Sequence, residues 1–136
     1  MKRWLKAFRL RTLPLSLSGI VLGTILAANQ GKINGLLLAL CIISTILFQI
    51  LSNLANDLGD NTSGVDNDLR VGPKRSTQTG EISPKEMKRA VIFFAILSLL
   101  SGSATAYIGT VGLNQTYLLL FFVLGIASIG AAIKYT

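Results

Sequence analysis

Four long stretches without a charged side chain dominate this chain of 136 residues. They cover about residues 13–28, 36–54, 90–110 and 117–133 and are strongly apolar. An apolar segment of about 20 residues is long enough to cross the hydrocarbon core of a bilayer as an α-helix. Since 51% of the residues are hydrophobic and only 14% are charged, a soluble domain of this size would lack polar surface. The sequence predicts an all-α membrane protein with four transmembrane helices, in one multi-pass unit over residues 1–136.

Basic side chains gather in two places outside the apolar stretches. The N-terminal group is Lys2, Arg3, Lys6, Arg9 and Arg11, and the loop group is Arg70, Lys74, Arg75, Lys85, Lys88 and Arg89. Cytoplasmic segments of membrane proteins carry an excess of Lys and Arg. We therefore expect a multi-pass protein of the cell (inner) membrane. Its N-terminus and a large loop, residues 55–89, are expected on the cytoplasmic side. The net charge of +7 then reflects topology and contact with the lipid bilayer, and we predict no nucleic-acid partner.

The first eleven residues allow two interpretations. A basic stretch with Trp and Phe can lie in the membrane interface as a short amphipathic helix. Alternatively, a basic segment, an apolar run and the small residues Ala27 and Ala28 have the order of a secretory signal. Three further apolar stretches follow without an exported domain, which favours the first interpretation.

A helix start is marked just ahead of the third stretch. Ser83-Pro84-Lys85-Glu86 has the pattern of a capping box, with Ser at the N-cap, Pro at the first helical position and Glu at the third. We interpret Ser83 and Glu86 as cap residues and not as catalytic residues.

All the acidic residues of the chain lie between positions 57 and 86: Asp57, Asp60, Asp66, Asp68, Glu81 and Glu86. The densest group follows the second stretch. If the helix continues there, Asn53, Asn56, Asp57 and Asp60 stand at i, i+3, i+4 and i+7 and share one helix face.

Two carboxylates on one helix face repel each other unless a positive charge lies between them. Mg²⁺ commonly uses one or two carboxylates together with substrate phosphates and water. The alternative is that these acids merely solvate a helix end, but negative charge at a helix C-terminus is electrostatically unfavourable. We therefore predict a metal site.

A basic turn follows the acidic group: Arg70-Val71-Gly72-Pro73-Lys74-Arg75. Guanidinium groups beside a Mg²⁺ site suit an anionic diphosphate. We assign this binding role to Arg70 and Arg75, and a topological role to Lys85, Lys88 and Arg89. A cation site and basic residues beside an apolar helical bundle fit a lipid that carries a diphosphate.

These residues resemble a known family. The run Leu51-Ser52-Asn53-Leu54-Ala55-Asn56-Asp57, followed by Asp60 and Gly64-Val65-Asp66, is similar to the first aspartate-rich motif of the UbiA superfamily of intramembrane prenyltransferases. Four further segments resemble the subfamily that prenylates 1,4-dihydroxy-2-naphthoate in menaquinone synthesis. They are Arg9-Leu10-Arg11-Thr12-Leu13-Pro14-Leu15, Arg70-Val71-Gly72-Pro73 with Arg75, Glu86-Met87-Lys88-Arg89-Ala90 and Ala131-Ala132-Ile133-Lys134-Tyr135-Thr136.

The resemblance implies a Mg²⁺-dependent enzyme with a polyprenyl diphosphate and an aromatic acceptor as partners. Ionisation of the diphosphate would give an allylic cation, which an electron-rich ring carbon attacks; loss of the carboxylate of the naphthoate then gives demethylmenaquinone. By position, Asn53, Asp57 and Asp60 would bind the metal, with Asp57 and Asp60 as the catalytic pair. The diphosphate would be bound by Asn53, Asn56, Asp66, Arg70 and Arg75.

The resemblance also has a limit. Members of the superfamily have more membrane helices and a second aspartate-rich motif, so residues 1–136 look like the N-terminal half of a UbiA-type helical bundle. We expect this half alone to be inactive.

Three other functions stay open from the sequence. One is a prenyltransferase with another aromatic acceptor, and another is a non-catalytic membrane module that binds Mg²⁺ or a lipid diphosphate. A transporter would be expected to carry ionisable groups within its spans. The four apolar stretches contain none, which disfavours transport.

Overall fold

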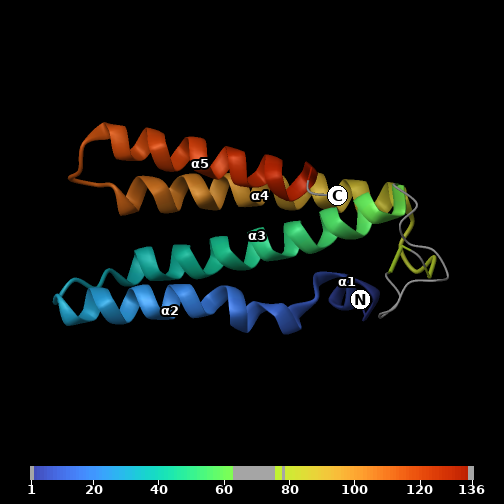
Figure 1. The fold of residues 1–136 in the computed structure, drawn as a ribbon, viewed down its shortest axis with the longest axis horizontal. Coiled ribbons are helices and arrows are strands. Elements are labelled where there is room, and N and C mark those ends of the chain that lie inside the picture. Colours follow the sequence, from blue (N-terminus) through green and yellow to red (C-terminus); the bar gives the residue numbers. More distant parts are fainter. Residues whose placement is uncertain (1, 63–75, 78, 135–136) are drawn as a thin grey trace.

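The chain folds into two antiparallel helical hairpins that lie side by side (Figure 1). This computed structural model describes residues 2–62, 76–77 and 79–134. The elements are α1 (Lys2–Phe8), the 3-10 turn η1 (Leu10–Thr12), α2 (Leu13–Asn29), α3 (Gly35–Thr62), α4 (Pro84–Gly109) and α5 (Gln115–Lys134). The α2–α3 and α4–α5 turns lie at one end of the molecule, while α1 and the end of α3 lie at the other. The described residues form no strand, so the predicted all-α class is confirmed.

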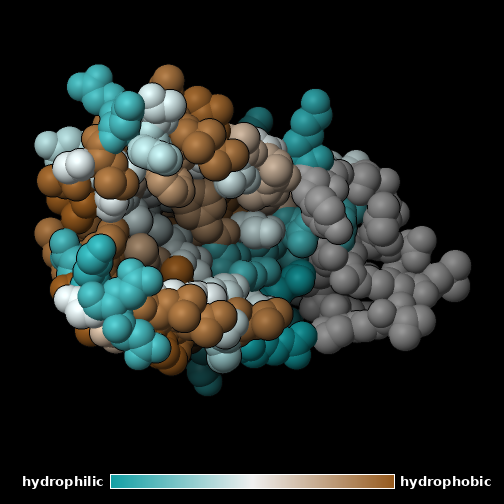
Figure 2. Space-filling model, turned by 60° about the vertical axis from the view of Figure 1, so that its left-hand side comes forward, coloured by the Kyte–Doolittle hydropathy of each residue, from teal (hydrophilic) through white to brown (hydrophobic). Residues whose placement is uncertain are grey.

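Four helical segments are long and apolar enough to cross a membrane: Lys2–Asn29, Gly35–Thr62, Pro84–Gly109 and Gln115–Lys134. Large apolar side chains cover their outer surfaces, with Leu22 60%, Leu100 62% and Leu119 65% exposed. Figure 2 shows this apolar surface in brown over most of the visible helices. Water would make such a surface an aggregation hazard, whereas lipid solvates it.

The start of α4 follows the predicted capping box. The backbone N–H of Glu86 donates to Ser83 Oγ (3.2 Å), and the backbone N–H of Ser83 donates to Glu86 Oε2 (2.9 Å). Pro84 occupies the first helical position. Two backbone donors that the helix itself cannot satisfy are thus paired, and α4 begins at Pro84.

The helix α3 is longer than the apolar stretch that predicted it. It continues past residue 54 to Thr62, so residues 55–62 are helical although they were assigned to the loop 55–89. Residues 84–89 are helical as well, because they belong to α4. Tertiary packing accompanies the extension of α3: Ala55 is 3% exposed and Leu58 packs against the buried core, so the polar end of the helix has its own apolar contact.

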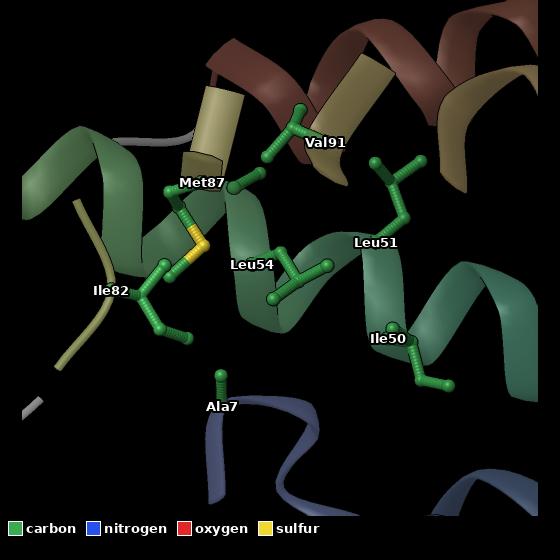
Figure 3. Close-up of a cluster of buried hydrophobic side chains, with 8 residues drawn as sticks. Ala7, Ile50, Leu51, Leu54, Ile82, Met87 and Val91 are labelled. Carbon is green, nitrogen blue, oxygen red and sulfur yellow. The ribbon is translucent and has the colours of Figure 1, made fainter. Parts of the chain in front are cut away.

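The buried core lies at the charged end of the molecule and not midway along the helices. Leu51 and Leu54 of α3 contact Met87 of α4 and Ile82, all at 0% exposure, and Ala7 of α1 packs against the same group (Figure 3). Burial of one such Leu or Met side chain contributes about 1.5–3 kcal/mol. The core therefore attaches α1 and the residues ahead of α4 firmly to the polar end of α3.

Farther from this core, α3 and α4 approach each other through small residues. A Cβ built on Gly102 would lie 3.4 Å from Cε2 of Phe48, and Ser98 is completely buried. Small residues at such positions let two membrane helices pack closely. This contact joins the two hairpins.

Candidate functional site

The aspartate-rich segment, residues 53–60, lies at the C-terminal end of α3, which ends at Thr62. Because residues 35–62 are one continuous helix, Asn53, Asn56, Asp57 and Asp60 do stand along one side of it. Asn53 and Asp57 are only 6% and 1% exposed, while Asn56 and Asp60 are partly exposed. The structure thus places two of the predicted site residues in the protein interior and two at its edge.

Asp57 forms an ion pair with Arg9, which lies 48 positions earlier in the chain. Arg9 occupies the turn between α1 and η1 and has a left-handed backbone conformation, with φ 49° and ψ 49°. A buried carboxylate is stable only when positive charge or hydrogen bonds compensate it. The sequence assigned Arg9 to the topology-setting group, and no local pattern could have indicated its contact with Asp57.

Asn53 attaches the same turn to α3. Its side-chain amide donates to the backbone carbonyl of Phe8 (2.9 Å) and to the Thr12 hydroxyl (3.4 Å). Its carbonyl oxygen accepts from Gln49 Nε2 at 3.5 Å, and Gln49 in turn accepts from the hydroxyl of Ser16. A chain of polar side chains therefore runs from the aspartate segment into the apolar part of the α2–α3 hairpin.

The residues that precede α4 close over the other side of Asp57. Thr77 donates its hydroxyl to the backbone carbonyl of Asp57 (3.1 Å). Its neighbour Ser76 is 1% exposed, and the Ser76 hydroxyl has no hydrogen-bond partner among the described residues. A buried hydroxyl of this kind usually binds water or a ligand. Neither residue was predicted for the site; their only signal was proximity to the basic turn in sequence.

Ion pairs tie α1 to the segment ahead of α4. Arg3 pairs with Glu86 (3.1 Å) and also donates to the backbone carbonyl of Glu81 (2.9 Å), while Lys6 pairs with the Glu81 carboxylate (3.0 Å). Phe8 packs edge to face on Phe94 of α4, with ring centroids 5.4 Å apart. The two glutamates therefore face the N-terminal cations and take no part in the aspartate segment.

The donor atoms of the aspartate segment suit a hard cation. Within residues 2–62, 76–77 and 79–134, no three His, Cys, Asp or Glu side chains come close enough to hold a metal by themselves. Mg²⁺ does not need three, since it usually takes one or two carboxylates and completes its shell with phosphate oxygens and water. Asp57 and Asp60, with the amide oxygens of Asn53 and Asn56, match that donor set. The predicted ligands Asp66, Arg70 and Arg75 lie outside the described residues.

A cavity that includes several hydroxyl and amide side chains in its lining adjoins the segment on its N-terminal side. It has a volume of about 340 Å³ and is lined by Ser16, Ser44, Thr45, Phe48, Gln49 and Ser52. In Figure 2 the brown outer surface gives way to white and teal side chains in the recess between the two hairpins. Gln49 belongs both to the cavity and to the hydrogen-bonded chain that reaches Asn53. Hydroxyl and amide groups of α2 and α3 thus lie within the membrane region, on the N-terminal side of the aspartate segment.

Comparison with known proteins shows to which family this chain belongs. The sequence model of the UbiA prenyltransferase family matches residues 16–136. The chain belongs to the UbiA prenyltransferase family. The resemblance carried by the aspartate-rich motif is therefore confirmed, and the matched region contains most of α2, all of α3 to α5 and all the aspartates.

Two curated relatives narrow the likeness within the UbiA family. The chain is 46% identical over 138 aligned residues to the 1,4-dihydroxy-2-naphthoate octaprenyltransferase of Haemophilus influenzae, and 45% identical over 133 to the protein of that name from Escherichia coli. These alignments cover 100% and 98% of this chain but only 44% and 42% of the relatives. The chain thus spans less than half the length of either relative. No solved structure gives a significant match.

Proposed function

We propose that the protein to which this chain belongs transfers a polyprenyl group from its diphosphate to 1,4-dihydroxy-2-naphthoate. In this reaction the prenyl group takes the place of the ring carboxylate, and diphosphate and carbon dioxide leave. The observation that carries the proposal is 46% identity, over the entire chain, to a protein named for this activity. The aspartate segment beside this cavity supports the same conclusion.

In this proposal the aspartate segment would bind the metal and the diphosphate, and the apolar helices would bind the prenyl chain. Asp57 and Asp60, with Asn53 and Asn56, would hold Mg²⁺ against the diphosphate, together with Asp66, Arg70 and Arg75. The cation would neutralise the charge that develops on the leaving diphosphate. The apolar helices would enclose the prenyl chain and exclude water from the reactive carbon.

The charge distribution supports one orientation in the membrane. The N-terminal cations of α1, and Lys85, Lys88 and Arg89 at the start of α4, lie at the same end of the bundle as the aspartate segment. By the positive-inside rule, this end would face the cytoplasm across the cell (inner) membrane. A polyprenyl diphosphate lying in the membrane could then place its headgroup at the aspartates.

The decisive assay measures transfer of a labelled polyprenyl diphosphate to 1,4-dihydroxy-2-naphthoate in membranes that contain the protein as its gene encodes it. We expect product that requires Mg²⁺ and disappears when EDTA removes the cation. Asp57→Asn should lower the rate on the order of 100-fold or more, because it removes an electrostatic contact made to the developing charge. Glu81→Gln is the matched control, since it removes one acidic group whose partner is Lys6; its rate should stay near wild type.

Two results would change the proposal. Product with a different aromatic compound, and none with 1,4-dihydroxy-2-naphthoate, would keep the prenyltransferase and replace the acceptor. Absence of transfer to any acceptor would favour a membrane module that binds Mg²⁺ and a lipid diphosphate without catalysis. Residues 1–136 expressed alone should not transfer the prenyl group, because they supply less than half the length of the relatives.

A further inference from the structure

Arg9 holds a conformation that needs outside support. A residue other than glycine rarely adopts the left-handed region, and it does so at a conformational cost. Here hydrogen bonds fix the backbone on both sides of Arg9. Its N–H donates to the Lys6 carbonyl (3.3 Å), its own carbonyl accepts from the Thr12 N–H (2.9 Å), and the preceding carbonyl of Phe8 is held by Asn53 (2.9 Å). The backbone at Arg9 is therefore held by local hydrogen bonds and by the Asn53 contact from α3, and the Arg9 guanidinium pairs with Asp57 of the same helix.

The guanidinium and a divalent cation would seek the same carboxylate. Asp57 is 1% exposed, and the Arg9 side chain that pairs with it is 28% exposed. Burial makes charge compensation at Asp57 necessary whether or not a metal is bound. Two cations brought to one carboxylate also repel each other. The binding of a metal and the Arg9–Asp57 contact must therefore oppose each other.

Resting on the proposed function, which places a divalent cation at the aspartate segment, we propose that Arg9 is a positioning residue for this site. It occupies and orients the Asp57 carboxylate while the cation is absent, and it gives up that contact when the cation binds. Arg9 lies ahead of residues 16–136, the region that the family match covers. Because Arg9 connects α1 to η1, occupancy of the cation site is coupled to the attachment of residues 8–12 to α3.

Cation binding at the aspartate segment and attachment of the α1–η1 turn to α3 should weaken each other. Removal of the Arg9 charge should strengthen cation binding, since a competitor is lost. Linkage requires the reciprocal effect, namely that a bound cation weakens the contact between the α1–η1 turn and α3. The ion pairs of Arg3 with Glu86 and of Lys6 with Glu81 do not involve Asp57. They would keep α1 attached, so the loosening should be confined to the region around Arg9.

The first test titrates Mn²⁺ into the gene-encoded protein in detergent, without diphosphate, and follows bound ion by electron paramagnetic resonance. Arg9→Gly removes the charge and tolerates the left-handed backbone, so it isolates the side chain. We expect its Mn²⁺ dissociation constant to fall by about fivefold or more, the lower range of typical coupling between sites. Lys2→Gln is the control, because it removes an exposed charge from the same helix; its dissociation constant should match wild type.

The second test needs no variant and so survives a failure of Arg9→Gly to fold. Backbone amides of residues 8–12 in the wild-type protein should exchange hydrogen faster with saturating Mn²⁺ than without it. An unchanged or weaker Mn²⁺ affinity in Arg9→Gly, or unchanged exchange in the wild type, would overturn the role of Arg9 while leaving the proposed function intact. Failure of the wild type to bind Mn²⁺, both without and with added inorganic diphosphate, would instead overturn the metal site on which both proposals rest.

Discussion

The side-chain amide of Asn53 donates a hydrogen bond of 2.9 Å to the backbone carbonyl of Phe8, although the two residues are 45 positions apart. Asn53 is 6% exposed, so water cannot easily replace this contact. The residue that belongs to the family's aspartate motif thus also fixes the end of α1. A mutation there would affect the position of the N-terminal segment as well as any bound ligand.

Asn53→Ala should destabilise the protein by about 1–3 kcal/mol, because the buried Phe8 carbonyl loses its donor. The α1–η1 turn should also become more accessible. Trypsin cleavage after Arg9 and Arg11 in detergent, followed over time, measures that accessibility directly. Gln30→Ala is the control, since Gln30 is an exposed amide at the opposite end of α2. Equal cleavage rates in Asn53→Ala and wild type would show that the Phe8 contact does not hold the turn.

The capping box should make Ser83 important for stability but not for chemistry. Ser83→Ala removes the acceptor of the Glu86 backbone N–H and should cost about 0.5–2 kcal/mol. Ser83→Asp retains an acceptor at the N-cap and should lose much less. The measurement is the apparent thermal midpoint of unfolding in detergent, compared between wild type and the two variants. If both variants lowered the midpoint equally, the cap would not be the source of the effect.

The hydroxyls of Ser44 and Thr105 form a 2.8 Å hydrogen bond between α3 and α4 within the apolar part of the bundle. Hydrogen bonds between membrane helices contribute about 0.6 kcal/mol on average, with a maximum near 1.7. A double-mutant cycle with Ser44→Ala and Thr105→Val should give a coupling energy in that range. Val conserves the shape of Thr, so the coupling energy from the cycle reflects the loss of the hydrogen bond between the two hydroxyls. Strict additivity of the two single changes would contradict the predicted bond.

Gly102 should be intolerant of large side chains because of the aromatic ring opposite it. A Cβ at this position lies 3.4 Å from Cε2 and 3.8 Å from Cζ of Phe48, so Gly102→Leu forces α3 and α4 apart. We expect a loss of about 1–3 kcal/mol, typical of overpacking. Gly130→Leu is the matched control, since a Cβ there meets nothing within 4 Å. Both changes raise helix propensity equally, and a lower unfolding midpoint for Gly102→Leu alone would confirm the close contact.

The class of protein, the presence of the long helices and the family all follow from the order of residues along the chain. Long uncharged stretches specify membrane-spanning helices because the bilayer requires every backbone polar group to be paired within the segment. The Ser83–Glu86 capping box and the i, i+3, i+4, i+7 spacing of the aspartate segment involve neighbours within two turns. Local patterns of this kind can be read without knowing how the chain folds.

Only the tertiary structure decided what surrounds the aspartates. The partners of Asp57 and Asn53 include Arg9, Phe8 and Thr77, and the first two lie more than forty positions away in the chain. Their meeting depends on α1 packing into the core around Leu54 and Met87, and the same packing accompanies the extension of α3 to Thr62. The physical reason is that helix formation depends on contacts a few residues apart, whereas the compensation of a buried charge depends on whichever side chains the packed helices bring to it.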